Sequence, residues 1–345
     1  MPASGNSAAG RLRAGGRALL LLADPVNVAI LRRLAAGPLE STALLERIDY
    51  VSRSTYFDRM RDLEELCLVG RWRRADVPPV AECWLAGPGE RLLPVARLLD
   101  GWLSAAPRDP LQLGQAYATT VMKALAVGWG STLLRWLAER PHSLSELEHL
   151  VDGFGYRKLE RICRDLVKAE LAERVVIRGR LSAYGMTSWG RRAAGPLAAA
   201  IRWEQHEIPE WSAAVTSTEV EGGLMLALPL IDLPSDVSGT CSLLVDADAP
   251  ERQSLGGAVV RVVHGRAVSW APATDLHPRA DCWVRGTTLA WLDTVGATRS
   301  ADLRQGGDTG LAEKMIAALR GASSAEAITR LTNWAGEPPE PAGLL

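Results

Sequence analysis

Apolar residues recur at helical spacing in three consecutive segments within residues 1–70. In the first segment they fall on one side of a helix, which a Gly-Pro step then ends. The second helix is short, with Ser41 or Thr42 as the expected N-cap, and the third begins at Ser52. The predicted helices are "PVNVAILRRLAAG" (25–37), "ESTALLERI" (40–48) and "SRSTYFDRMRDLEELCLV" (52–69).

A two-stranded ribbon and a closing helix follow, and the whole order then occurs a second time. The ribbon is expected over "LVGRWRRADVPPVAECWLA" (68–86) and the helix over "GERLLPVARLLDGWL" (89–103). Arg-Asp-Leu at 61–63 returns 103 positions later at 164–166, whereas Gly89 returns 101 positions later as Gly190. A two-residue deletion in the second ribbon's tip explains the change. The repeated order of helix, helix-turn-helix, hairpin and helix predicts two winged helices.

The first copy resembles the winged helix-turn-helix transcriptional regulators of the HxlR type, which are close to the MarR class. The resemblance covers residues 18–103 and includes the Ser-Arg-Ser-Thr opening at 52–55, the Pro-Pro-Val-x-Glu stretch at 78–82 and the closing Trp102. It implies that the third helix enters the major groove and that the wing lies on the DNA backbone. The second copy lacks that opening and has a shorter wing, so base contact and a structural or dimer-forming role both stay open for it.

A helix that reads DNA presents polar side chains on one face while its other face packs in the core. Short hydroxyl groups suit phosphate oxygens, and arginine reaches guanine edges or phosphates. The candidates in the first copy are Ser52, Arg53, Ser54, Thr55, Tyr56 and Arg59 on the third helix and Arg71, Arg73 and Arg74 at the wing entry. The candidates in the second copy are Tyr156, Arg157, Lys158 and Arg161. The alternative is that these are ordinary solvated basic faces.

The net charge of −1 conceals two parts of opposite charge. Residues 1–206 hold 29 Lys and Arg against 22 Asp and Glu, a net charge of +7. Residues 207–345 hold 10 against 18, a net charge of −8. A basic part beside an acidic one indicates nucleic-acid binding by the basic part.

From about residue 216 the pattern changes to short Val- and Leu-rich runs bounded by Gly, Pro and Asp, which predict strands. A hairpin turn is expected at His264-Gly265. The predicted strands are "GGLMLALPLI" (222–231), "TCSLLVDAD" (240–248), the two arms of "GGAVVRVVHGRAVSWAP" (256–272) and the first part of "ADCWVRGTTLAWL" (280–292). The predicted helices are "TLAWLDTVG" (288–296) and "TGLAEKMIAALRGA" (309–322). Strands followed by helices indicate a small α+β domain.

This third segment resembles the sterol-carrier-protein-2-like domain over residues 215–322. The resemblance lies in the strand hairpin, the Asp-x-x-Val-x-Gly step at 281–286 and the Gly-Asp at 307–308 before the closing helix. It implies a sheet and helices that enclose an apolar cavity for a small hydrophobic ligand. The candidate lining residues are Trp270, Trp283, Trp291 and Met315, for which ordinary core packing is the alternative.

Several kinds of chemistry find no support in the sequence. Five widely spaced cysteines without a Cys-x-x-Cys pair favour neither a disulfide framework nor a metal site. No dinucleotide, phosphate-loop or His-Glu-x-x-His motif is present, and neither His264 nor His277 adjoins a nucleophile signature. We therefore expect no catalytic residue and no cofactor. The apolar run at 18–23 is too short to cross a bilayer, so a cytoplasmic protein is expected.

These observations predict a mainly α N-terminal part, made of tandem winged helix-turn-helix domains, followed by a small α+β ligand-binding domain. The expected boundaries are a disordered arm (1–16), two winged helices (17–106 and 115–206), the ligand domain (215–322) and a tail (323–345). The protein is predicted to be a transcriptional regulator that binds double-stranded DNA, with an affinity that changes when a small hydrophobic ligand binds. It could form a homodimer. The alternative is a protein that sequesters a hydrophobic metabolite and uses the winged helices to dimerise. An enzyme ranks last.

Overall fold

The computed structural model describes residues 12–48, 51–74, 80–126, 130–151, 153–177, 181–246, 256–273, 279–295 and 302–323. Its first unit contains α1 (Gly16–Ala23), α2 (Pro25–Leu34), β1 (Leu39–Glu40), α3 (Ser41–Glu46), α4 (Arg53–Glu65), β2 (Val69–Arg74), β3 (Val80–Leu85) and α5 (Gly87–Ser104). The strands form an antiparallel sheet in the order β1-β3-β2. The predicted N-terminal helix-turn-helix with a wing is confirmed for this unit.

The second unit repeats this order of elements, except that its last helix is divided into α10 and α11. It contains α6 (Ala116–Ala126), α7 (Gly130–Glu139), β4 (His142–Ser143), α8 (Leu144–Leu150), α9 (Tyr156–Lys168), β5 (Ala172–Ile177), β6 (Leu181–Met186), α10 (Ser188–Arg191) and α11 (Ala194–Glu207). Its antiparallel sheet has the order β4-β6-β5. The bounds of α9 and β5 lie 103 positions after those of α4 and β2, and those of β6 lie 101 positions after those of β3.

The two units share the same backbone turn between helix and wing. Cys67 and Glu170, which are 103 positions apart, both adopt left-handed φ values, of 54° and 59°. The next helix packs closely against that turn through a glycine. A methyl group added at Gly89 would come 2.1 Å from the Leu68 carbonyl oxygen, and one at Gly190 would come 2.2 Å from that of Leu171. Only glycine fits either position without a shift of the backbone.

The third part is a mixed five-stranded sheet with helices. Its elements are η1 (Pro209–Trp211), α12 (Ser217–Ala227), η2 (Leu228–Leu230), β7 (Gly239–Val245), β8 (Gly256–Val263), β9 (Arg266–Pro272), β10 (Cys282–Gly286), α13 (Thr288–Val295), β11 (Arg304–Gly307) and α14 (Thr309–Ser323). The strand order is β11-β10-β7-β8-β9, with β10 parallel to β7 and the other neighbours antiparallel. His264 and Gly265 both have positive φ and form the predicted β8–β9 turn.

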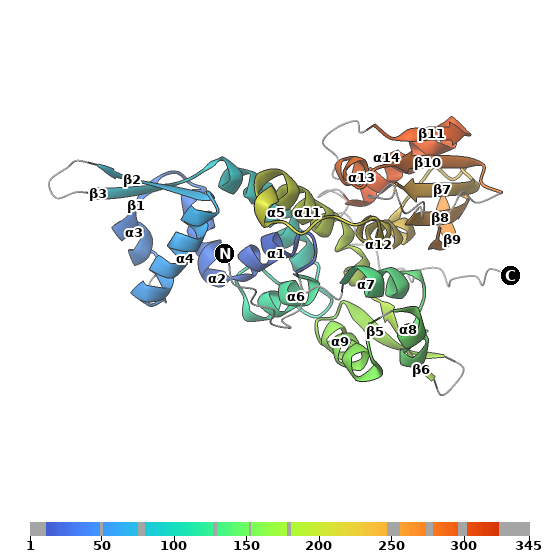
Figure 1. Ribbon diagram of the computed structural model, residues 1–345, viewed down its shortest axis with the longest axis horizontal. Coiled ribbons are helices and arrows are strands. Elements are labelled where there is room, and N and C mark those ends of the chain that lie inside the picture. The colour runs from blue at the N-terminus through green and yellow to red at the C-terminus, as the bar shows by residue number, and fades with distance from the viewer. Residues whose placement is uncertain are drawn as a thin grey trace, which may run out of the picture.

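Helices from both units meet at the centre of the molecule (Figure 1). Helix α1 packs on α6, and α5 packs on α11. The wing of the first unit lies at the left of Figure 1, the second unit lies at the lower right, and the five-stranded sheet lies at the upper right. Helix α12 connects the last two, because it packs on both α7 and β8.

Three local predictions were wrong. The segment 222–231 was expected as a strand, but residues 222–230 lie in α12 and η2. A capping box between Thr216 and Glu219 starts this helix, which is buried on most sides and so lacks a clear hydrophobic period. Residues 12–16 of the expected arm are packed, with Ala14 fully buried, whereas residues 1–11 and the tail after 323 lie outside the described residues. The N-cap of α3 is Glu40 rather than Ser41 or Thr42.

Candidate nucleic-acid interface and apolar cavity

The N-terminus of α4 is held by a cluster of hydroxyl groups. The Ser52 side chain caps the helix by accepting a hydrogen bond of 3.2 Å from the Thr55 backbone N–H. Its oxygen also lies 3.0 Å from the Ser54 hydroxyl and 2.8 Å from the Thr55 hydroxyl. These three predicted residues therefore lie together at the start of the helix, where backbone N–H groups favour an anion such as phosphate.

One face of α4 is open to solvent along its length. Arg53 extends from its first turn, and it forms no ion pair within the described ranges. Phe57 lies on this face too, and 47% of its surface is exposed. An aromatic ring on such a face suits contact with a thymine methyl group. The exposed face consists of Arg53, Ser54, Phe57, Asp58 and Arg61.

Other predicted residues of the first unit are buried or already paired. Tyr56 is fully buried and donates a 3.4 Å hydrogen bond to the Ser41 carbonyl, so its assignment to the DNA surface was wrong. Burial raises the pKa of this phenol. Arg59 pairs with Asp24 at 2.8 Å, across to α2, and Arg71 pairs with Glu64 at 3.4 Å. The side chains of Arg73 and Arg74 lie outside what the structure describes.

Helix α9 presents its predicted residues at the equivalent surface. Tyr156, Arg157, Lys158 and Arg161 are all exposed. The Lys158 ammonium lies 4.2 Å from the centre of the Phe154 ring, which orients it beside the helix start. Glu148 of α8 accepts a 2.9 Å hydrogen bond from the Tyr156 backbone N–H. The residues equivalent to the exposed face of α4 are Tyr156, Arg157, Glu160, Arg161 and Arg164.

A comparison with protein-family models matches the part of the chain that contains α4. The matching family model is the HxlR-like helix-turn-helix, over residues 21–109. Residues 21–109 are an HxlR-like helix-turn-helix domain. Such a domain implies a DNA-binding transcriptional regulator, and α4 is the second helix of its helix-turn-helix. A search of curated proteins and a search of solved structures each find no match.

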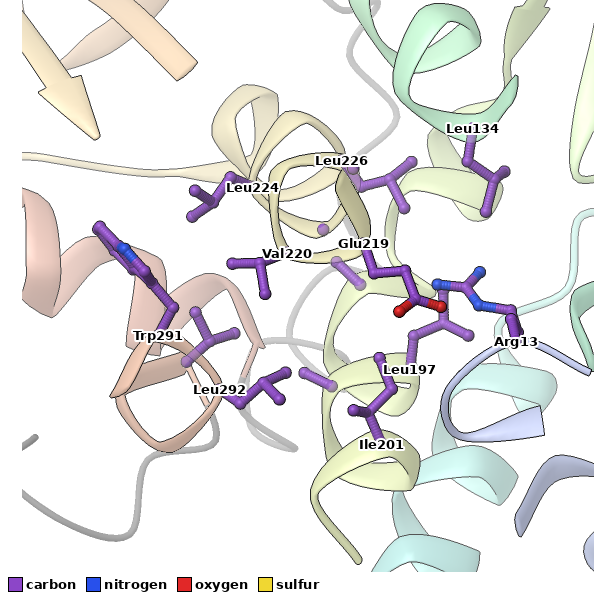
Figure 2. Close-up of a pocket in the computed structure, with 15 residues that line it drawn as sticks. Arg13, Leu134, Leu197, Ile201, Glu219, Val220, Leu224, Leu226, Trp291 and Leu292 are labelled. Atoms are coloured by element: carbon purple, nitrogen blue, oxygen red, sulfur yellow. The ribbon is translucent and has the colours of Figure 1, made fainter. Parts of the chain in front are cut away.

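An apolar cavity lies between the second unit and the third part of the chain. Figure 2 shows Leu197 and Ile201 of α11 on one side, and Val220 and Leu224 of α12 above Trp291 and Leu292 of α13. Its volume is about 30 Å³, enough for about two water molecules. A site for a drug-sized molecule has about 300 Å³ or more, so a ligand must first separate these helices.

Arg13 and Glu219 form the polar end of the cavity (Figure 2). The Arg13 side chain is buried, and its Nε and Nη1 have no hydrogen-bond partner in the part of the chain that the structure describes. Burial lowers the pKa of this guanidinium, an effect that the nearby Glu219 carboxylate opposes. Glu219 accepts a hydrogen bond of 3.0 Å from the Ala14 backbone N–H, which fixes residues 12–15 against α12.

The four residues predicted to line a cavity do not lie together. Trp291 is fully buried, lines this cavity and donates a 2.8 Å hydrogen bond to the Leu244 carbonyl. Trp270 instead donates to the Ala138 carbonyl of α7, at 3.1 Å. Trp283 covers Gly306 on the neighbouring strand β11, and Met315 is buried in the core. Trp270 therefore joins the five-stranded sheet to α7 of the second unit.

A buried ion pair joins the same two parts. Arg135 of α7 contacts Glu221 of α12 at 2.7 Å, with side-chain exposures of 18% and 3%. Burial raises the pKa of Glu221 to about 7, although the Arg135 charge and a hydrogen bond from the Gly257 backbone oppose this. The charge state of Glu221 therefore changes near neutral pH, at the junction between the second unit and the sheet.

The described residues show no candidate metal site. They contain no group of three or more His, Cys, Asp and Glu side chains that could hold a metal ion. His264 lies in the β8–β9 turn, and His277 lies outside the described residues. All five cysteines are free. No helix in the described ranges is long and apolar enough to span a bilayer.

Proposed function

We propose that this protein is a transcriptional regulator that contacts DNA through α4 and α9, and that its third part changes DNA affinity when a small hydrophobic molecule binds. The observation that carries the first half is the exposed face of α4 in an HxlR-like domain, with Arg53 unpaired in the described ranges and three hydroxyl groups at the helix start. The second winged helix is supported by the repeated order of elements and by the exposed basic face of α9.

Fluorescence anisotropy tests DNA binding on duplexes from the promoter region next to the gene, with a scrambled duplex as control and several salt concentrations. We expect tight, sequence-dependent binding by the wild type. Arg53→Ala should weaken it by about tenfold and reduce the salt slope by about 1, because one phosphate or base contact is lost. Arg261→Ala is the matched control, since it removes an exposed positive charge from β8, far from α4 in Figure 1. Equal weak binding to both duplexes would reject the regulator.

The proposed ligand effect depends on the position of the cavity. Its walls come from α11, which packs on α5, and from α12 and α13 of the third part. A molecule that separates these walls therefore shifts the third part against the helices that join the two units. An apolar molecule with a hydrogen-bond acceptor at one end fits the lining, because Arg13 offers two unpartnered donors there.

A thermal-shift screen of apolar carboxylic acids and their methyl esters tests the ligand effect, followed by anisotropy with each compound that binds. We expect the acids to raise the unfolding temperature and to change DNA affinity. Gly223→Phe should block both effects, since Gly223 lines the cavity and has open space beside it. A compound that binds the protein without changing DNA affinity would favour the alternative, a protein that sequesters hydrophobic metabolites.

A further inference from the structure

The contacts between the two units occur in pairs with the partners exchanged. Positions in the two units correspond at 103 residues before the wing tip and at 101 residues after it, so Trp102 corresponds to Trp203 and Pro88 to Trp189. The Trp102 indole donates a 3.0 Å hydrogen bond to the Trp189 carbonyl. The Trp203 indole donates one of the same length to the Pro88 carbonyl. One contact is thus the image of the other.

Helices α1 and α6 show the same exchange. Thr119 corresponds to Gly16, and Ala126 corresponds to Ala23. The Thr119 hydroxyl donates a 2.7 Å hydrogen bond to the Ala23 carbonyl. In the reciprocal contact, a methyl group added at Gly16 would come within 2.7 Å of the Ala126 carbonyl oxygen. Each of these helices therefore approaches the backbone of its counterpart at matching positions.

Reciprocal contacts of this kind are the signature of a two-fold interface, in which residue i touches j and j touches i. In this protein both partners belong to one chain. The central helices in Figure 1, α1 with α6 and α5 with α11, hold the units as a symmetric homodimer holds two subunits. The faces of these helices that make the contacts are occupied within the molecule, so no second copy is needed to pair two DNA-reading helices.

The two helices that this arrangement presents are chemically different. The face of α4 carries an aromatic ring, Phe57, where α9 has the carboxylate of Glu160. At the first position of the helices, Arg53 corresponds to Tyr156. A base pair is read by the donors, acceptors and apolar groups that face it, so these helices suit different base sequences.

The third part makes the two units still less alike. The Trp270 indole of this part donates a hydrogen bond to the Ala138 carbonyl of α7. Ala138 corresponds to Ala35 in the first unit. Ala35 instead lines an open groove with Pro38 and Trp84. Within the described ranges, the five-stranded sheet therefore contacts α7 of the second unit, while the equivalent surface of the first unit lines an open groove.

We propose that one chain, without a second copy, binds an operator made of two unlike half-sites in inverted orientation, one read by α4 and the other by α9. This proposal rests on the proposed DNA-binding function. The centres of the half-sites should lie about 10 base pairs apart or a multiple of that, because both helices must reach the same side of the duplex.

Selection from a random duplex library on the full-length protein provides the operator, and hydroxyl-radical footprinting then maps it. We expect two protected segments of different sequence and a complex of one 37.2 kDa chain per duplex by sedimentation velocity. Arg53→Ala should weaken protection of one segment, and Arg157→Ala that of the other. Replacing either half-site by a copy of the other should reduce affinity about tenfold or more.

Different failures separate this proposal from the function on which it rests. Two chains on a palindromic operator would overturn the proposal, as would a single protected segment that responds to Arg53→Ala and ignores Arg157→Ala. In both cases sequence-specific DNA binding would survive. Failure to select any duplex would reject the DNA-binding function itself. Both substitutions lie on exposed helix faces, and unchanged unfolding temperatures would show that the variants remain folded.

Discussion

The stacked tryptophans between the two units provide the sharpest test of how the units are held together. The rings of Trp102 and Trp189 lie 4.6 Å apart and are inclined by 7°, and their exposures are 0% and 4%. Each indole N–H donates to the backbone carbonyl of the other residue, at 3.0 Å and 2.9 Å. The pair therefore contributes ring packing and two buried hydrogen bonds to one interface.

Replacing Trp102 by phenylalanine retains an aromatic ring but removes the indole donor and part of the buried surface. The Trp189 carbonyl then loses a buried donor, which costs about 1–3 kcal/mol, and the weaker stack costs about 0.5–1.5 kcal/mol more. We expect the free energy of unfolding to fall by about 1.5–4.5 kcal/mol. Since the two residues touch, Trp102→Phe combined with Trp189→Phe should lose less than the sum of the single changes.

Urea unfolding followed by circular dichroism measures these differences from the shift in midpoint multiplied by the slope m. Trp72→Phe is the matched control, because Trp72 is 63% exposed on the wing and the same substitution should cost less than about 0.5 kcal/mol. A loss for Trp102→Phe no greater than that of the control would show that the tryptophan pair does not hold the units together. Additive single and double changes would refute direct coupling between the two rings.

Two further predictions concern the repeated glycine and the buried carboxylate. Gly89→Ala and Gly190→Ala should each lower the free energy of unfolding by about 2–4 kcal/mol, because the new methyl group meets a backbone carbonyl. Gly223→Ala in α12 is the control, since open space lies beside Gly223, and it should not destabilise the protein in the same urea titration. For Glu221, burial raises the pKa from 4.5 to about 7, so its contribution to stability is fully present below pH 4.5 and falls by about 3 kcal/mol as the pH rises through 7. Unfolding measured from pH 4.5 to 8 should show this loss in the wild type and a flatter profile in Glu221→Gln, and parallel profiles would exclude Glu221 as its source.

Helical periodicity and repeat spacing predicted most of the two N-terminal units. The change of offset from 103 to 101 placed the deletion between β5 and β6, because a hairpin tip tolerates length changes that the helices and strands do not. Helix α12 was missed, since a helix buried against α7, α11 and β8 has no polar face to reveal its period. Strand β11 was missed because its sequence, RQGG, has no apolar residue.

The candidate site was predicted less completely than the fold. Residue type alone identified Ser52, Arg53 and Arg157, which are exposed at the starts of two helices. It placed Tyr56 on the DNA surface, although the structure buries Tyr56 and exposes the adjacent Phe57, because adjacent aromatics give no clear choice of face. The pairing of Arg59 with Asp24 depends on how α4 packs against α2, which the sequence does not display.

The third part of the chain is attached to the two units by different contacts. The contacts of Glu221 with Arg135 and of Trp270 with Ala138 both end on α7, the helix that precedes α8 and α9 in the second unit. In a symmetric homodimer an effector domain acts on both reading helices alike. Here α12 packs directly on α7 of the second unit, whereas it contacts the first unit through the hydrogen bond of Glu219 with Ala14. Ala14 lies next to α1, which packs on α2, and α2 packs on α4. If a bound molecule moves the third part as proposed, that movement should reach the two units by different routes, through α7 in one and through residues 12–15 in the other.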